Sequence, residues 1–268
     1  VLTNLDAPDF RVMTAPLDAP GDWTELIGHT PGRRIAAVEP FAGHLAVLEW
    51  AAAQPQVRIV GRTGSVGVLA IDTEPHDVGF AANEVWDTTL VRLTHASLTV
   101  PARTIDVDVV TGEIDVVKQT PVLDVDLHDY ASARLWATAD DGTRVPVDIV
   151  HHVDTALDGT APIVVYAYGS YEYSVPPWFS IARLSLLDRG VVWALAHPRG
   201  GGELGRQWYL DGKLLHKRNT FTDVITCADH LVAEGIGDGA RVGVRGGSAG
   251  GLMVGACITI DRSRFSVG

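Results

Sequence analysis

Cysteine, long apolar runs and targeting signals are scarce or missing in this 268-residue sequence. The two cysteines, Cys227 and Cys257, fall at apolar positions of predicted helices, so we expect buried free thiols and no disulfide framework. No apolar run approaches the roughly 18–20 residues that a membrane-spanning helix needs. Residues Val1–Asn4 lack the basic region and apolar stretch of a signal peptide. We therefore expect a cytoplasmic protein without a membrane partner.

Positive charge is also in short supply. The chain has 21 Lys and Arg against 33 Asp and Glu, a net charge of −12. This balance argues against nucleic acid and anionic membranes as partners, and it is compatible with cationic peptide substrates. The chain is 46% hydrophobic and 20% charged, so it can bury a core as one large domain or two smaller ones.

Sustained helical periodicity is missing from residues 1–119, where short strands alternate with turn residues. The candidate strands are Arg34–Phe41, His44–Ala51, Val57–Gly61, Val66–Asp72, Val78–Ala82, Thr89–Thr94, Thr104–Val110 and Glu113–Lys118. The last two flank Thr111-Gly112 and predict a hairpin. Such strands are typical of a sandwich or a propeller. A propeller blade uses about 40–45 residues, so this region would hold fewer than three blades.

The pattern changes after residue 119. Leu135–Ala139 and Arg144–His151 predict a hairpin around Asp141-Gly142, and strands then alternate with helices. The elements that follow are a strand at Pro162–Ala167, a short helix from Ile181 that Gly190 ends, a strand at Val191–Ala196, and a long helix with Asn219 or Thr220 as its cap and Gly235 as its stop. Apolar strands separated by helices indicate a parallel sheet covered on both faces.

The segment Gly246-Gly247-Ser248-Ala249-Gly250 fits the G-x-S-x-G nucleophile elbow of α/β-hydrolases. Arg241–Arg245 before it predicts a strand. Met253, Ala256, Cys257 and Ile260 after it have helical spacing. A serine hydroxyl is a weak nucleophile until a base accepts its proton, and the strand-turn-helix context presents that hydroxyl at a sharp turn. Ser248 is therefore the predicted nucleophile.

A histidine is missing where this topology needs one. In α/β-hydrolases the catalytic serine is followed in the chain by an Asp or Glu and then by a His. The only acid after Ser248 is Asp261, and no His follows. We therefore expect that the triad Asp and His are not in this chain, which would be a piece of a longer protein, and that residues 1–268 alone would be inactive and poorly soluble.

Several blocks together resemble the prolyl oligopeptidase family of serine peptidases, and within it the oligopeptidase B subfamily. The blocks are Tyr166–Tyr171, Arg183–Gly190, His197–Gly205, Lys213 with His216–Asp223, Gly246–Gly251, and the link Lys118–Pro121. The resemblance covers most of residues 118–268 and is weaker over residues 1–117. It implies that residues 1–119 are the C-terminal part of a β-propeller and that residues 120–268 are the N-terminal part of an α/β-hydrolase catalytic domain.

The resemblance also implies a function. That family cleaves short peptides, and oligopeptidase B prefers bonds after Arg or Lys. Ser248 would form the acyl-enzyme without a cofactor or metal. The backbone N–H of Ala249 and the hydroxyl of Tyr168 would hold the oxyanion, where two donors aimed at developing charge lower the barrier. Tyr166 and Tyr171 are the neighbouring tyrosines that compete for this role.

One segment departs from the subfamily pattern. Oligopeptidase B commonly carries acidic residues after the Gly-Ser-Tyr block, and these help to bind a second basic side chain. This sequence has Val175–Phe179 there, and the nearest acid is Glu172. A preference for dibasic substrates is therefore not expected.

Other residues that suggest chemistry have structural interpretations. We expect Arg199 and Glu203 to form a structural ion pair. His151-His152 look like a metal pair, but adjacent strand residues point to opposite faces, so a strand end at the surface is the better interpretation. Gly200–Gly202 lacks the Lys-Ser/Thr of a phosphate-binding loop, and the scattered acids show no calcium-loop spacing.

The sequence is also compatible with two other functions. One is a different α/β-hydrolase, such as an acyl-peptide hydrolase or an esterase. The other is a non-enzymatic, propeller-type binding module in which the elbow motif is incidental.

Overall fold

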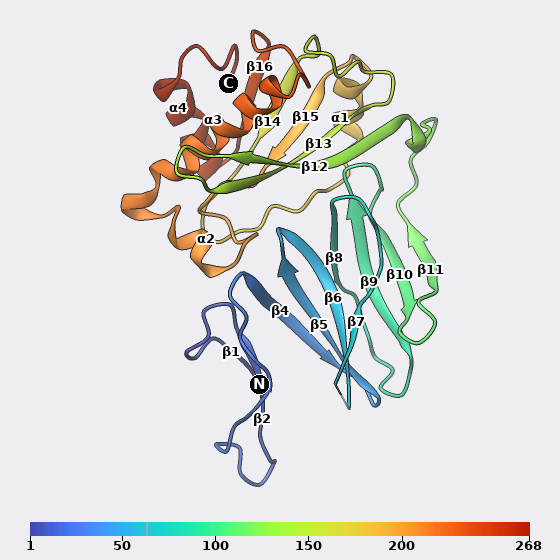
Figure 1. Ribbon diagram of the computed structural model, residues 1–268. Helices are drawn as coiled ribbons and strands as arrows, with labels where there is room; N and C mark the ends of the chain where they lie inside the picture. Colours follow the sequence, from blue (N-terminus) through green and yellow to red (C-terminus); the bar gives the residue numbers. More distant parts are fainter. Residues whose placement is uncertain (63) are drawn as a thin grey trace.

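The computed structural model describes residues 1–62 and 64–268. Figure 1 shows an all-β part, which contains the N-terminus, below a part in which helices surround a sheet and which contains the C-terminus. The boundary that we place between residues 119 and 120 stays a prediction. The last strand of the all-β part ends at Gln119, and the next element begins at Leu127.

The all-β part is built of three antiparallel meanders, in which each strand pairs with the strand that precedes it. The first holds β1 (Leu2–Thr3), β2 (Arg11–Thr14) and β3 (Thr24–Ile27). The second holds β4 (Arg33–Pro40), β5 (His44–Ala51), β6 (Gln54–Gly61) and β7 (Gly64–Val68). The third holds β8 (His76–Phe80), β9 (Leu90–Ser97), β10 (Arg103–Asp108) and β11 (Ile114–Gln119).

Alternating burial explains why the two four-stranded sheets pack together. In β9 the side chains of Val91, Leu93 and His95 are buried, whereas their sequence neighbours Leu90, Arg92 and Thr94 are exposed. Val57 and Ile59 of β6 join Val91 and Leu93 in one apolar cluster. A strand with period-two burial presents one face to a core, and the two inner faces share that core.

The predicted hairpin around Thr111-Gly112 is confirmed by the pairing of β10 with β11. The strand predicted at Val66–Asp72 is wrong in extent, because β7 ends at Val68. Strands β1, β2 and β3 were not predicted. They have two to four residues each, too few for a periodic pattern to emerge from the sequence.

The second part contains a five-stranded sheet in the order β12-β13-β15-β14-β16. Its strands are β12 (Tyr130–Thr138), β13 (Arg144–His152), β14 (Ile163–Tyr166), β15 (Val192–Ala196) and β16 (Val242–Arg245). The expected parallel arrangement holds for β15, β14 and β16. The sheet as a whole is mixed, because the hairpin β12–β13 joins it antiparallel to β15.

Helices cover both faces of this sheet, as Figure 1 shows. Long helix α3 (Arg218–Ala233) and helix α4 (Ala249–Ile260) share a core with alternate strand residues such as Ala194. Helix α1 (Ile181–Leu187) packs on the opposite face, where Trp193 points. The remaining helical segments are α2 (Arg206–Leu210), η1 (Leu127–Asp129) and η2 (Leu214–His216). No described helix is long and apolar enough to cross a membrane.

The N-terminus of α3 lies earlier than predicted. The helix begins at Arg218, after Lys217, so neither Asn219 nor Thr220 is its cap. Thr220 is fully buried, and its hydroxyl donates to the carbonyl oxygen of Arg199 at 2.5 Å. The Thr220 hydroxyl thus joins α3 to the turn that follows β15, and it does not cap the helix. The predicted stop is confirmed, because α3 ends before Gly235, which has φ +71°.

Candidate active site

Ser248 lies at the turn between β16 and α4, as the elbow motif predicts. Its backbone has φ 55° and ψ −121°, a conformation that costs a non-glycine residue about 1–3 kcal/mol. The turn is tight, because a Cβ added at Gly246 would lie 2.5 Å from the carbonyl oxygen of Gly250. Strain of this kind concentrates at functional sites, and here it raises one serine above the end of a strand.

The Ser248 side chain is exposed, and its hydroxyl forms no hydrogen bond with residues 1–62 or 64–268. All ten histidines precede it in the chain. Cys257 and Cys227, on the helices beside the elbow, are buried free thiols as expected. Burial raises the pKa of Cys257 to about 12, so its thiol is not a reactive thiolate.

Tyr168 lies at the same edge of the sheet as Ser248. β14 and β16 are parallel neighbours, and Tyr166 is in register with Arg245, so both chains leave the sheet side by side. A Cβ added at Gly250 would lie 3.7 Å from both Cα and Cδ2 of Tyr168. The fold therefore brings Ser248, Ala249 and Tyr168 together at the first turn of α4. The catalytic roles of these three residues stay predictions.

The competing tyrosines have other surroundings. The Tyr166 ring lies on the α1 face, with its centroid 5.6 Å from that of Trp178 and 6.1 Å from that of Trp193. Tyr171 is 76% exposed. The Tyr168 ring meets Tyr173 edge to face at 5.7 Å, which fixes one side of the ring.

The glycine run Gly200–Gly202 serves close backbone packing. A Cβ at Gly200 would overlap the carbonyl oxygen of Gly169, and one at Gly202 would overlap that of Glu172. The segment after Tyr168 therefore lies directly on this turn. This contact gives the glycine run a physical reason other than phosphate binding.

The predicted ion pair between Arg199 and Glu203 is wrong. Arg199 instead pairs with Asp223 at 2.7 Å and with Asp141 at 2.5 Å. The hydrogen bond from Arg199 is the main reason that the pKa of Asp141 is lowered to about 2. Arg199 thus ties the end of β15 to α3 and to the β12–β13 turn, and its role is structural.

Glu203 belongs to a buried charge network that the sequence did not reveal. Its Oε1 lies 3.5 Å from Nδ1 of His197, and His197 Nε2 lies 2.9 Å from Oδ2 of Asp148. Arg134 Nε donates to the other oxygen of Asp148 at 2.6 Å. Burial opposes charge on His197, but Asp148 and Glu203 outweigh it and raise the His197 pKa. The available signal was a charged residue, Asp148, within the otherwise apolar run Val145–Val150.

The same network links three regions. Arg134 Nη1 donates to the carbonyl oxygen of Ala53 in the β5–β6 turn at 2.6 Å. Glu203 Oε1 accepts the backbone N–H of Val175 at 2.9 Å. One row of charges therefore runs from the all-β part through the sheet to the segment that follows Tyr168.

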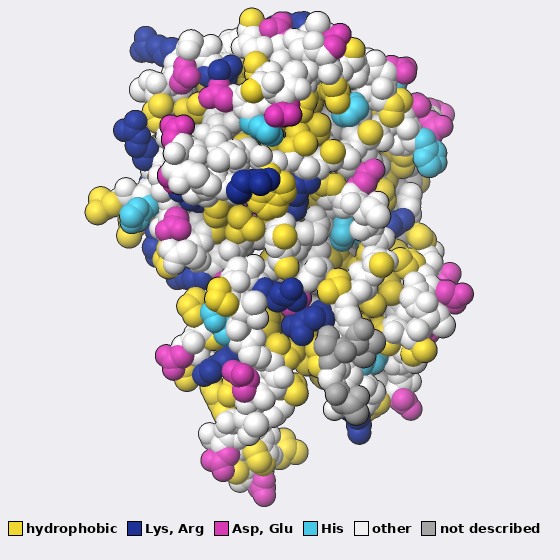
Figure 2. All heavy atoms as spheres, in the orientation of Figure 1, with side chains coloured by type: hydrophobic (Ala, Val, Ile, Leu, Met, Phe, Trp, Pro, Cys, Tyr) yellow, Lys and Arg dark blue, Asp and Glu magenta, His cyan; other side chains and the backbone are white. Residues whose placement is uncertain are grey.

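Glu172, the acid nearest to the Val175–Phe179 segment, is already engaged. Its carboxylate pairs with Arg34 of β4 at 3.7 Å and with Arg206 of α2. It therefore joins the two parts of the molecule. On the face seen in Figure 2, basic side chains also gather where the upper and lower parts meet.

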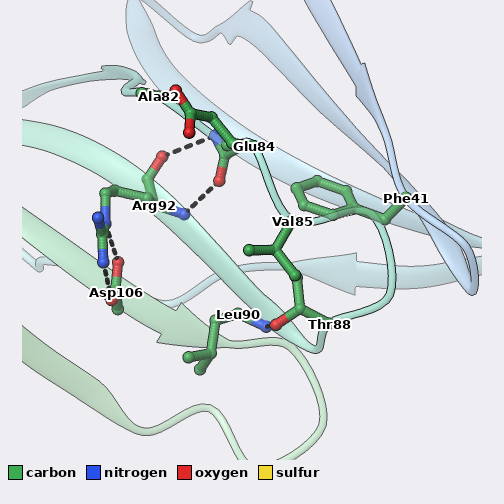
Figure 3. Close-up of a pocket in the computed structure, with 9 residues that line it drawn as sticks. Phe41, Ala82, Glu84, Val85, Thr88, Leu90, Arg92 and Asp106 are labelled. Atoms are coloured by element: carbon green, nitrogen blue, oxygen red, sulfur yellow. Dashed lines mark hydrogen bonds and ion pairs between the residues drawn. The ribbon is translucent and has the colours of Figure 1, made fainter.

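A cavity of about 340 Å³ in the all-β part does not compete as an active site. Figure 3 shows Arg92 and Asp106 joined by a bidentate ion pair in this cavity, opposite the ring of Phe41. Phe41 precedes β5, and Arg134 of the second part contacts Ala53 in the turn that follows β5. The cavity therefore lies at the end of β5 away from the elbow-bearing sheet. Within the described ranges, no group of three His, Cys, Asp or Glu residues could hold a metal ion.

The fold and the site define a class: a serine hydrolase elbow on an α/β sheet, preceded by propeller-like meanders. Residues 1–120 match the model of the prolyl oligopeptidase N-terminal β-propeller domain, and residues 177–268 match that of the prolyl oligopeptidase family. The chain belongs to the prolyl oligopeptidase family, a family of serine peptidases. The predicted fold class, part of a propeller followed by part of an α/β-hydrolase domain, is confirmed.

Individual relatives agree with this assignment. The chain is 43% identical to dipeptidyl aminopeptidase BI of Pseudoxanthomonas mexicana and 34% identical to Protease 2 of Moraxella lacunata, over its whole length in both cases. It superposes on oligopeptidase B from Trypanosoma brucei with covalently bound antipain, in a closed form, with a TM-score of 0.89 at 36% identity over 99% of the chain. It spans 38% or 39% of the length of these three proteins.

Proposed function

We propose that the whole protein is a serine peptidase that hydrolyses short peptides through an acyl-enzyme on Ser248. The observation that carries the proposal is the strained, exposed serine at the end of β16, with Tyr168 beside the first turn of α4. The serine oxygen attacks the substrate carbonyl, and its proton passes to a histidine base. The Ala249 N–H and the Tyr168 hydroxyl hold the oxyanion while the amine leaves. Water then attacks the acyl-enzyme and releases the second product.

We propose that the catalytic base and its carboxylate are not among residues 1–62 and 64–268. No histidine in these ranges forms a hydrogen bond with Ser248. We therefore propose that residues 1–268 alone hydrolyse no peptide bond. They would also be poorly soluble, because Leu252 of α4 is 61% exposed and the outer edge of β16 is paired through the short segment Ser266–Val267. Ser248-dependent hydrolysis by residues 1–268, at a rate comparable to the whole protein, would contradict this.

For specificity we propose cleavage after Arg or Lys. The support is the likeness to oligopeptidase B from Trypanosoma brucei and from Leishmania major, together with the net charge of −12, which favours cationic peptides. A second candidate is removal of dipeptides from a free N-terminus, which the 43% identity to dipeptidyl aminopeptidase BI favours.

Two matched substrates separate these candidates. One is a peptide with a single internal Arg and a blocked N-terminus, and the other is the same peptide with a free N-terminus two residues before the cleaved bond. Turnover of the blocked peptide supports the endopeptidase proposal. Turnover of the free peptide alone supports the removal of dipeptides from a free N-terminus.

The central test of the function is Ser248→Ala in the whole protein. Peptidase activity should fall to background while the thermal transition is unchanged. A fluorophosphonate should label the unmodified protein at Ser248, and the absence of labelling and turnover would favour a non-enzymatic binding module. Turnover of esters or acyl-peptides but not of longer peptides would favour the other hydrolase classes.

We also propose that the protein is cytoplasmic, with peptides rather than nucleic acid or membranes as partners. The support is the pair of buried free thiols and the acidic charge balance. Cell fractionation with detection of the protein in the cytosolic fraction is the test.

A further inference from the structure

Lys217 is a half-buried ammonium that points at the segment behind Tyr168. Its Nζ donates to the carbonyl oxygen of Gly169 at 2.6 Å, to Oγ of Ser170 at 2.7 Å, and to Oγ1 of Thr220 at 3.2 Å. A lysine ammonium has three donors, and all three are used here. Two of them hold the two residues that directly follow Tyr168.

The position is unusual for a cation, because Lys217 makes no ion pair with any carboxylate of the described residues. Burial lowers its pKa to about 8, which reflects the cost of keeping the ammonium away from water. Lys217 and Lys213, four residues earlier, each lie near an aromatic ring: Lys217 Nζ is 5.9 Å from the ring centroid of Phe221, and Lys213 Nζ is 4.6 Å from that of Tyr209. A half-buried cation without a counter-ion is retained at a cost to stability, so its hydrogen bonds require an explanation.

Gly169 itself is fixed against the start of α3. It has φ +63°, and a Cβ there would lie 2.5 Å from Cγ2 of Thr220 and 2.8 Å from Cγ of Pro198. The Thr220 hydroxyl donates to the carbonyl oxygen of Arg199. Three segments therefore meet at one point: the loop after β14, the turn after β15 and the first turn of α3. Lys217 is the charged donor at that point.

We propose that Lys217 is a positioning residue for the oxyanion site. By holding the carbonyl of Gly169 and the hydroxyl of Ser170, it fixes the backbone that carries Tyr168, so that the phenol faces the first turn of α4 beside Ser248. The inference rests on the proposed function of Ser248 and Tyr168. It assigns the oxyanion geometry to a residue of another element, 49 positions after Tyr168 in the sequence.

The test is a double-mutant cycle in the whole protein, with peptide hydrolysis as the readout. Lys217→Met keeps the length of the side chain and removes the ammonium. It should lower kcat by roughly 10–10²-fold, because a small misplacement of a catalytic group has effects of this size, and it should change KM much less. Lys213→Met, which removes the same charge from the neighbouring turn, is the matched control and should leave kcat within about twofold.

The cycle is closed with Tyr168→Phe. If Lys217 acts through the phenol, Lys217→Met should cause no further loss of kcat in the Tyr168→Phe background. Independent effects that multiply would overturn the inference while leaving the proposed function intact. A Tyr168→Phe variant with unchanged kcat would overturn both the role of Tyr168 and that of Lys217, and the Ser248→Ala result would still decide whether the protein is a serine peptidase.

A second measurement separates positioning from a general loss of folding. A peptide aldehyde that forms a hemiacetal with Ser248 needs the oxyanion donors, whereas a product peptide does not. Lys217→Met should weaken binding of the aldehyde by about the same factor as it lowers kcat. It should leave the Kd of the product peptide unchanged. Equal weakening of both ligands would overturn the inference. If Lys217→Met fails to fold, Lys217→Gln, which retains two donors, serves in its place and should show a smaller loss with the same pattern.

Discussion

The two sides of the candidate active site are built in different ways. The elbow around Ser248 is a backbone structure, in which Gly246 and Gly250 approach so closely that no side chain fits between them. The segment around Tyr168 is held by side chains from other elements. Lys217, just before α3, donates to the carbonyl oxygen of Gly169, and Glu203 accepts the backbone N–H of Val175. Glu172, within the segment, pairs with Arg34 and Arg206. The nucleophile is thus set locally, and the oxyanion donor is set by the tertiary structure.

This difference predicts that the elbow tolerates substitution less well than the segment around Tyr168 does. Gly246→Ala places a Cβ 2.5 Å from the carbonyl oxygen of Gly250, so the turn must open. Activity should fall by roughly 10³-fold, because the nucleophile and the Ala249 donor move together. Gly247→Ala, where nothing lies within 4 Å of the added Cβ, is the matched control and should retain most of the activity. Peptide hydrolysis by the two variants measures the contrast, and equal activities would refute it.

The oxyanion side should show a graded response. Tyr168→Phe should lower kcat by roughly 10–10³-fold with less effect on KM, because one of two donors is lost in the transition state. Steady-state kinetics on a single peptide measures this. Tyr171→Phe, at the exposed neighbouring tyrosine, is the control. A larger loss in Tyr171→Phe than in Tyr168→Phe would reassign the donor.

Glu203 should act on the same side through stability and position. Its Oε1 accepts the backbone N–H of Val175 and also lies 3.5 Å from Nδ1 of His197. Glu203→Gln therefore removes the charge that faces the imidazole and nearly conserves the shape of the side chain. We expect a loss of about 1–3 kcal/mol in the free energy of unfolding. Chemical denaturation measures the change. An unchanged midpoint would show that Glu203 is not part of a charged network.

The pH dependence of stability should report the same network. The His197 pKa is raised above 6.5, so its contribution is complete below pH 6.5 and is lost as the pH rises through the folded value. Burial would raise the pKa of Asp148, but His197 and Arg134 outweigh it and hold the value below 3.8, so its contribution is lost on acidification. The Tm should therefore be highest at pH values between the folded-state pKa of Asp148 and that of His197. It should fall at lower pH, where Asp148 is protonated, and at higher pH, where His197 loses its proton. His197→Gln should flatten the alkaline limb, and a limb that persists in this variant would assign the effect to another group.

The sequence could predict the features that depend on local pattern but not those that depend on tertiary contacts. The elbow, the buried strands and helices α1, α3 and α4 carry local patterns, and these were predicted to within a few residues. The partners of Arg199 and the His197 network depend on which turns meet after folding, and the pairing of Arg199 with Asp141 and Asp223 spans distant segments. The role of Thr220 was misread for the same reason, because its hydroxyl serves a neighbouring turn and not its own helix end.

The most direct test of the account is the identity of the nucleophile. The whole protein is incubated with a fluorophosphonate, digested and examined by mass spectrometry, and the same peptide substrate is assayed with the unmodified protein and with Ser248→Ala. The account predicts a single adduct on Ser248, with loss of turnover in proportion to labelling, and no activity in the variant. Near-normal peptidase activity in Ser248→Ala, or an adduct on another residue that tracks the loss of activity, would contradict it.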